Sequence, residues 1–169
     1  MPLLSDYARR KKLDFLLKRL KPGDRVLEIG AGAGWLGPAL SHHGASYHSL
    51  DLKGPADFIG DIRDWKRLGV PEASFDFIVA LEVVEHVPCF EEIRDLLKPG
   101  GHLFATSPAP KWDWACAALE ALGLSQRRTS PHDHLIDFTG ITLLEPVLIK
   151  RVGLLSQWGL FRKPAAHAG

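Results

Sequence analysis

The sequence has few cysteines, almost no net charge and no long apolar run, and each of these absences excludes a class of protein. Two cysteines, Cys89 and Cys116, among 169 residues predict neither a disulfide framework nor a zinc site, so both are expected to be free, buried thiols. No segment reaches the roughly 18 apolar residues of a membrane span, and the N-terminus lacks the apolar stretch of a signal peptide. We therefore expect a cytoplasmic protein without integral membrane contact.

The balance of charge and the absence of linkers limit the partners and the domain count. A net charge of +1 provides no general attraction to nucleic acid. No low-complexity linker or repeat divides the chain, and 169 residues, 46% of them hydrophobic, can form one substantial core but hardly two. A single domain over residues 1–169 is predicted.

Residues 26–34 are the most informative segment. Apolar, β-favouring residues surround Glu28, alternating glycines follow at once, and residues 35–40 are typical of a helix start. A strand that ends in a Gly-rich turn and opens a helix lets a nucleotide-like ligand approach the main chain, because glycine has no Cβ and adopts positive φ. The segment therefore predicts a nucleotide-cofactor site.

The chemistry of that cofactor is open to two interpretations. Gly32, Gly34 and Gly37 satisfy the dinucleotide pattern G-x-G-x-x-G, and Asp51 follows Gly32 by 51 − 32 = 19 residues, which keeps an NAD-dependent oxidoreductase as an alternative. Glu28 argues against it, because a negative charge before the first glycine repels a pyrophosphate. S-adenosylmethionine carries a sulfonium and an ammonium instead, so nearby carboxylates suit it.

Four further segments follow in a recognisable order. They are residues 47–51, which end a strand-like run in an acid, residues 60–64, the apolar run 75–80 with 81–87 after it, and residues 96–101 before the strand-like 102–106. With residues 26–34, these motifs resemble class I S-adenosylmethionine-dependent methyltransferases over about residues 26–106. The segment Glu82-Val-Val-Glu85-His86 resembles the "E-V-x-E-H" segment of a subgroup that includes many enzymes modifying small molecules and lipid precursors.

The resemblance implies an α/β fold, a Rossmann-like doubly wound, mostly parallel sheet of about six or seven strands with helices on both faces. The alternation of strand-like and helix-like segments indicates the same parallel sheet with right-handed crossovers. Because ligands in such sheets bind beyond the carboxyl ends of the strands, four acids are expected to share one crevice. They are Glu28, Asp51, Asp61 and Glu82.

The resemblance also implies the roles of individual residues in holding S-adenosylmethionine. An acid at the position of Asp51 accepts the ribose hydroxyls, an acid at the position of Asp61 meets the adenine amino group, and the apolar side chain of Ile62 packs on the ring. The predicted cofactor-binding set is Glu28, Gly30, Ala31, Gly32, Trp35, Asp51, Leu52, Asp61, Ile62, Leu81 and Glu82.

Methyl transfer from a sulfonium is an in-line displacement whose leaving group is already activated, so alignment is the main requirement. A base is needed only where the acceptor is a hydroxyl or a protonated amine. His86, which follows the fourth strand, is the first candidate base; alternatively it begins a helix and only packs or hydrogen-bonds. His132 is the second candidate, and His134 competes with it.

Residues 107–137 are expected to form a substrate-side insertion. The candidate acceptor-binding residues there are Trp112, Arg127, Arg128 and His134, since arginines hold carboxylates or phosphates and tryptophan stacks on rings. Side-chain packing and an ordinary exposed connection are the alternatives. The two histidines have no third ligand nearby, so no metal is expected.

Residues 1–22 predict an amphipathic helix over 5–20 that ends at Pro22 and Gly23. Seven of the 21 lysines and arginines fall within the first 21 positions, either as a solvated face or as an electrostatic collar for an anionic substrate or an acidic membrane surface. In related enzymes a helix here covers the cofactor pocket, which makes Tyr7 and Arg10 candidate lid residues and Tyr7 a candidate contact to the acceptor.

The C-terminal part departs from the family pattern. Residues 138–145 can start a last helix, but Pro146 interrupts it, and residues 152–164 suggest one strand or a very tight pair. A shortened sheet edge is therefore expected, and it would expose apolar surface and favour a dimer.

Taken together, the motifs predict an S-adenosylmethionine-dependent methyltransferase for a small-molecule, lipid-precursor or sugar-precursor acceptor, as a monomer or homodimer. A catalytically silent cofactor-binding subunit that activates a partner is an alternative of another class. Nucleic-acid methylation is disfavoured, because the end of the fourth strand, Leu81-Glu82-Val83-Val84, lacks an Asn or Asp followed by Pro-Pro and an aromatic residue. No nucleic-acid-binding module is visible either.

Overall fold

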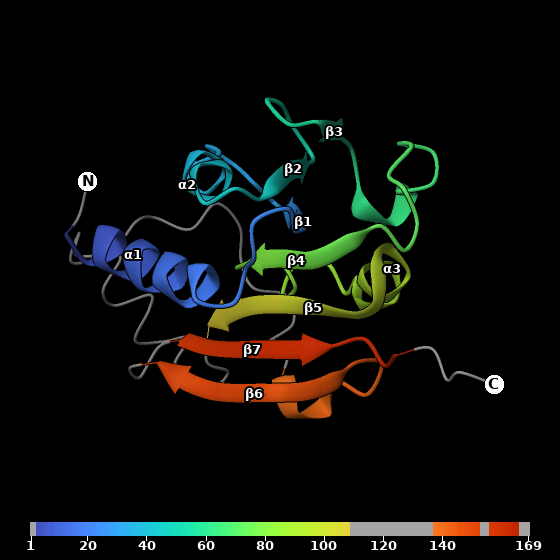
Figure 1. Cartoon of the computed structure of the whole chain (residues 1–169). Coiled ribbons are helices and arrows are strands. Elements are labelled where there is room, and N and C mark those ends of the chain that lie inside the picture. Colours follow the sequence, from blue (N-terminus) through green and yellow to red (C-terminus); the bar gives the residue numbers. More distant parts are fainter. Residues whose placement is uncertain (1–2, 109–136, 153–155, 166–169) are drawn as a thin grey trace.

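Seven strands form one sheet in the computed structural model, which describes residues 3–108, 137–152 and 156–165. The strands are β1 (Arg25–Ile29), β2 (Ser46–Asp51), β3 (Phe58–Ile59), β4 (Phe75–Leu81), β5 (Leu97–Pro108), β6 (Glu145–Val152) and β7 (Ser156–Arg162). Their order is β3-β2-β1-β4-β5-β7-β6 (Figure 1). The first five strands in this order are parallel, and β7 is antiparallel to both β5 and β6. The predicted mostly parallel, Rossmann-like sheet is confirmed.

Helices cover both faces of the sheet, as predicted. They are α1 (Leu3–Leu17), α2 (Gly37–His42) and α3 (Phe90–Leu96), with the 3-10 helices η1 (Ile62–Asp64) and η2 (Phe138–Gly140). Residues of α1 and α2 pack with Val26 in one apolar core, whereas residues of α3, η1 and η2 pack with Leu27 in another. Because successive side chains of a strand point to opposite faces, the central strand β1 is buried on both sides.

The N-terminal helix is shorter at its C-terminal end than the sequence predicts. α1 ends at Leu17, and Leu20 lies in a turn whose amide donates to the Leu16 carbonyl at 3.0 Å. Leu20 is nevertheless buried with Leu16, and the ring of Phe15 stacks on Phe104 with 4.6 Å between centroids. The apolar face of α1 therefore fixes it to the sheet. Among the described residues, no helix combines the length and hydropathy needed to cross a membrane.

The predicted turn before the fifth strand is part of β5 itself. Phe75 pairs with Leu97 but Phe77 pairs with His102, so the strand bulges between the two pairs. A Cβ at Gly101 would lie 2.9 Å from the Lys98 carbonyl oxygen and 3.0 Å from that of Phe75, so only glycine fits there. The bulge keeps residues 102–106 in register with β4, which places the ends of both strands at the same edge.

The C-terminal expectations are partly wrong. Residues 138–145 form only the short η2 before β6 begins at Glu145, and the pair of strands is β6 with β7, not a pair within residues 152–164. The expected shortening of the sheet edge is absent, since β6 has eight residues. Pro146 fits because β6 is an edge strand with a register shift between Pro146 and Leu148, where a missing N–H is tolerated. The prediction of exposed apolar surface holds for Val147 and Leu148, and the dimer stays a prediction.

Candidate cofactor and active site

The four predicted acids lie at the carboxyl ends of four neighbouring strands, β3, β2, β1 and β4. Glu28 is the penultimate residue of β1 and Asp51 is the last residue of β2. Asp61 follows β3 by two positions, and Glu82 follows β4 directly. Because these strands are adjacent and parallel, the structure brings the acids to one edge of the sheet.

Asp51 is joined directly to the glycine turn. Its Oδ2 accepts a hydrogen bond from the Gly32 amide at 2.8 Å, and its Oδ1 accepts one from the Lys53 amide at 3.1 Å. Gly30 and Gly32 have φ of +72° and +52°, the left-handed region that glycine adopts without strain. The turn after β1 and the acid after β2 therefore form one unit, although 19 residues separate Gly32 from Asp51.

Glu28 lies beneath this unit, on the α1 and α2 face of the sheet. Its side chain is only 2% exposed, and its Oε2 accepts a hydrogen bond from the Tyr47 hydroxyl. Burial raises the pKa of Glu28 to about 7, an effect that Tyr47 opposes and the nearby Asp51 reinforces. The charge under the turn is therefore sensitive to pH near neutrality.

Replacing Tyr47 with phenylalanine is expected to destabilise the fold more at high pH than at low pH. The folded state holds the Glu28 proton between the usual pKa of 4.5 and about 7, so stability falls as pH rises through this interval. Loss of the hydroxyl raises the Glu28 pKa further and leaves a buried carboxylate unpaired, at a cost of about 1–3 kcal/mol at pH 8 and less at pH 5. Urea unfolding at both pH values measures the difference.

Tyr7→Phe is the matched control for this substitution, because the Tyr7 side chain is largely exposed. It is expected to leave the free energy of unfolding nearly unchanged at both pH values. An equal loss of stability at pH 5 and pH 8 in the Tyr47 variant would show that the hydroxyl acts through packing and not through the charge of Glu28.

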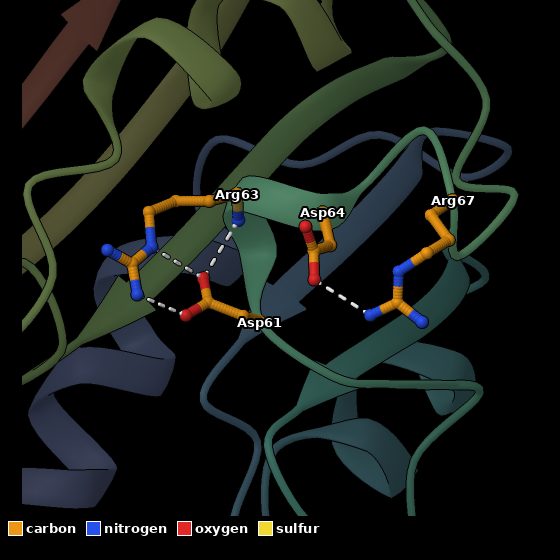
Figure 2. Close-up of polar contacts among 4 residues, drawn as sticks. All are labelled: Asp61, Arg63, Asp64 and Arg67. Carbon is orange, nitrogen blue, oxygen red and sulfur yellow. Dashed lines mark hydrogen bonds and ion pairs between the residues drawn. The ribbon is translucent and has the colours of Figure 1, made fainter.

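Asp61 is held by an arginine two residues further along the chain. Figure 2 shows the Arg63 side chain folded back onto the Asp61 carboxylate, while Arg67 reaches Asp64. Asp61 Oδ1 accepts from the Arg63 amide at 2.9 Å and from Nε at 3.0 Å, and Oδ2 accepts from Nη2. These contacts hold the pKa of Asp61 below its ordinary value. A carboxylate accepts about four hydrogen bonds, so Oδ2 keeps capacity for one more donor, such as an amino group.

Glu82 connects the end of β4 to β5 and to α1. Its φ is +57°, a conformation uncommon outside glycine. Three contacts hold it there: its amide donates to the Thr106 carbonyl at 2.9 Å, and its Oε1 accepts from Thr106 Oγ1 at 2.7 Å and from Lys12 Nζ at 2.8 Å. Strained backbone held by several contacts is a frequent property of functional sites.

The N-terminal helix therefore reaches the predicted site. Lys12 binds Glu82, and the Arg9 guanidinium lies 5.6 Å from the centre of the Trp35 ring, just after the glycine turn. Figure 1 shows α1 beside the ends of β4 and β5. This position is compatible with a helix that covers the site. The role of Tyr7 and Arg10 as lid residues stays a prediction.

Some of the remaining predicted site residues lie in the described part of the chain, and the others lie outside it. Ala31 and Ile62 are buried, Leu52 is exposed, and Leu81 ends β4. Ile62 packs in the core on the α3 side, so its contact with an adenine ring stays a prediction. Five candidates lie outside the described residues, namely Trp112, Arg127, Arg128, His132 and His134, as does Cys116. Cys89 is buried and free, as expected.

The sequence interpretation chose His86 and missed its neighbour Glu85. In the turn after β4, His86 is exposed whereas Glu85 is 2% exposed. Lys12, Tyr47, Arg63 and Thr106 were missed as well, and all of them contact predicted site residues. The only advance signal for Glu85 was its place in the E-V-x-E-H segment. Within the described part of the chain, His, Cys, Asp and Glu side chains form no cluster of three suited to a metal ion.

Comparison with known proteins identifies the family of the chain. The profile of a family described as a methyltransferase domain matches residues 5–146. The ubiquinone biosynthesis O-methyltransferase of Xylella fastidiosa (strain M23) is 33% identical over 115 residues, which cover 57% of this chain and 47% of the relative. That of Xanthomonas campestris pv. campestris (strain B100) is 30% identical, with coverages of 57% and 48%. The chain thus spans about half the length of the curated relatives it matches.

Solved structures share the fold at low sequence identity. A methyltransferase dependent on S-adenosylmethionine from Methanosarcina mazei has a TM-score of 0.63 at 17% identity, covering 89% of this chain and 97% of that chain. One from Aquifex aeolicus has a TM-score of 0.60 at 16% identity, covering 89% of each chain. These likenesses concern the fold. The family match extends over most of the sequence, from residue 5 to residue 146, and the chain therefore belongs to this methyltransferase domain family.

Proposed function

We propose that this protein binds S-adenosylmethionine at the carboxyl ends of β1–β4 and transfers its methyl group to an oxygen atom of a small-molecule acceptor. The hydrogen bond between the Gly32 amide and Asp51 carries the proposal, because it joins the open glycine turn to the acid that faces a ribose in this fold. Support also comes from the family match and from the sheet order.

The described residues suit a ligand with positive charge and hydroxyl donors. Asp51 offers carboxylate oxygens beside the main chain of the turn, and Asp61 keeps one acceptor position beside Arg63. When bound, S-adenosylmethionine supplies a methyl carbon activated by a positive sulfur. The protein's part is to fix that carbon in line with the acceptor, which by itself lowers the barrier substantially.

An oxygen acceptor is favoured by the names of the curated relatives, which are O-methyltransferases of ubiquinone biosynthesis. The chain spans about half the length of those relatives. The chemical class of its acceptor is therefore tested with hydroxyl, amine and thiol compounds. The cytoplasm as its location stays a prediction from the sequence.

Calorimetry with the full chain tests the cofactor. S-adenosylmethionine and S-adenosylhomocysteine are expected to bind with Kd in the range of about 1 μM to 1 mM, the usual range for enzyme ligands. NAD and NADH serve as the comparison ligands and are expected to show no heat of binding. Binding of the nicotinamide cofactor alone would instead support the oxidoreductase.

Turnover separates an enzyme from a silent subunit. Formation of S-adenosylhomocysteine is followed with catechol and benzyl alcohol as hydroxyl acceptors, benzylamine as an amine and thiophenol as a thiol. Methylation of at least one of them is expected. Tight cofactor binding without any turnover would instead support a subunit that activates a partner.

A further inference from the structure

Glu85 is a buried acid whose carboxyl oxygens are unpaired within the described part of the chain. It lies in the turn after β4 and is 2% exposed, and neither Oε1 nor Oε2 forms a hydrogen bond with any of the residues that the structure describes. The Ser107 hydroxyl, on β5, is buried too, and residues 3–108, 137–152 and 156–165 offer it no hydrogen bond either. Burying an unsatisfied carboxyl opposes folding, so its presence beside a ligand-binding edge requires an explanation other than stability.

The surroundings of Glu85 belong to the edge where the cofactor is proposed to bind. Register pairs Leu81, the last residue of β4, with Thr106, so Glu82 and Ser107 follow at the same level of the sheet. The groups that act on Glu85 are Glu82 after β4, Lys12 on α1 and Ser107 on β5. Burial and the charge of Glu82 raise the pKa of Glu85 to about 8, whereas Ser107 and Lys12 oppose the rise.

The two neighbouring candidates are less suited to receive a proton from an acceptor. Glu82 is already bound by Lys12 and by Thr106 through one oxygen. His86 is exposed in the same turn. Glu85 and Ser107, by contrast, have unused hydrogen-bonding capacity in a dry environment, where a new hydrogen bond is strong.

We propose that Glu85 and Ser107 bind the hydroxyl group of the methyl acceptor and that Glu85 takes its proton during transfer. This inference rests on the proposed function. The acceptor O–H bond breaks and its proton joins the Glu85 carboxylate, while the oxygen forms a bond to the methyl carbon. The carbon–sulfur bond breaks with both electrons going to sulfur, which becomes a neutral thioether. Ser107 positions the oxygen.

The properties of Glu85 match this role. A base works best when its pKa lies near the working pH, since it is then both available and strong enough. A carboxyl group at its ordinary pKa of 4.5 would be a weak base toward a hydroxyl. Burial raises the pKa of Glu85 and so makes its carboxylate a stronger base. A phenol, with a pKa of about 10, lies within reach of such a base.

The test compares Glu85→Gln and Ser107→Ala with the unmodified chain, with catechol as acceptor, across pH 6–10. We expect kcat/KM of the unmodified protein to rise with pH up to about 8. Glu85→Gln is expected to lose this rise and to be about 10²-fold slower at pH 7.5. Its deficit should shrink toward pH 10, where the phenol ionises without help. Affinity for S-adenosylhomocysteine should be unchanged in both variants.

Thermal unfolding provides a second measurement. If Glu85 were structural, its replacement would lower the Tm, whereas the proposed role predicts a higher Tm. Removing an unsatisfied buried carboxyl should raise the Tm, so Glu85→Leu is expected to be a few degrees more stable than the unmodified chain at pH 8 and inactive. Glu91→Gln, which changes an exposed acid on α3, is the matched control for charge and is expected to keep both the Tm and the pH profile.

The outcomes separate this inference from the proposed function. An unchanged pH profile and rate in Glu85→Gln, or loss of the rise in a His86→Gln variant instead, would overturn the inference while the methyltransferase stands. Methylation confined to benzylamine or thiophenol would overturn it too. A lowered Tm in Glu85→Leu together with weakened cofactor binding would show that Glu85 is structural. Absence of cofactor binding in the unmodified chain would reject the proposed function itself.

Discussion

Replacing Asp51 with alanine is expected to weaken S-adenosylmethionine binding by about 10²- to 10⁴-fold, because two hydrogen bonds to a charged acceptor, each about 1.5–3 kcal/mol, are lost. In the unliganded protein the same carboxylate accepts hydrogen bonds from the Gly32 and Lys53 amides. The substitution therefore also frees the turn that the ligand must meet. Calorimetric titration of the variant with S-adenosylmethionine and S-adenosylhomocysteine measures the effect.

Two variants make this result specific. Asp51→Asn keeps an acceptor oxygen but removes the charge, and an affinity between those of Asp51→Ala and the unmodified chain is expected. Asp64→Ala removes an exposed acid that pairs with Arg67 (Figure 2), and the affinity of this variant for S-adenosylmethionine should be unchanged. An Asp51→Ala protein that binds within threefold of the unmodified chain would refute the cofactor position.

The parts of the fold that the sequence predicts well are those set by local chemistry. A β-favouring run followed by glycines can hardly form anything but a strand and an open turn, so β1 and the turn at Gly30 were found from their residues alone. The same holds for the strand that ends at Asp51. Parallel topology then places these ends together without further information.

The C-terminal strands resisted prediction because their pairing is not local. β7 is antiparallel to β5, about 50 residues away, as in the pair of Thr106 with Trp158. A proline breaks a helix, as the sequence predicts for Pro146, but an edge strand tolerates it equally well. Edge position is a property of the whole sheet and cannot be read from the residues around a proline.

Side-chain partners at the site were the least predictable feature. Lys12 reaches Glu82 across 70 positions of sequence. Glu85 is buried in the turn after β4, where the positive φ of Glu82 ends the regular alternation of the strand. A sequence motif shows that Glu85 and His86 are adjacent, but only the backbone direction decides that the acid is buried and the histidine exposed.

Replacing Gly30 with alanine is expected to damage both stability and cofactor binding. Its φ of +72° costs an ordinary residue about 1–2 kcal/mol, and the new Cβ would collide with Cγ2 of Val83. Val83 lies between Glu82 and Glu85, so its displacement would move the segment after β4 as well as the turn after β1. A loss of about 2–4 kcal/mol and a Tm lower by roughly 5–15 °C are expected, since 1 kcal/mol corresponds to about 2–4 °C at this chain length.

Gly32→Ala isolates the contribution of the backbone in this prediction. Gly32 also has positive φ, at +52°, but no atom of the described residues lies within 4 Å of the position of its Cβ. Its loss of stability in the unliganded protein should therefore equal the conformational part alone, about 1–2 kcal/mol. The double variant Gly30→Ala with Val83→Ala removes the collision and keeps the strain, so it should regain binding relative to Gly30→Ala alone. If the two single glycine variants unfold at the same temperature, the contact with Val83 does not contribute to the loss of stability. The turn after β1 and the segment after β4 would then not be coupled through this contact.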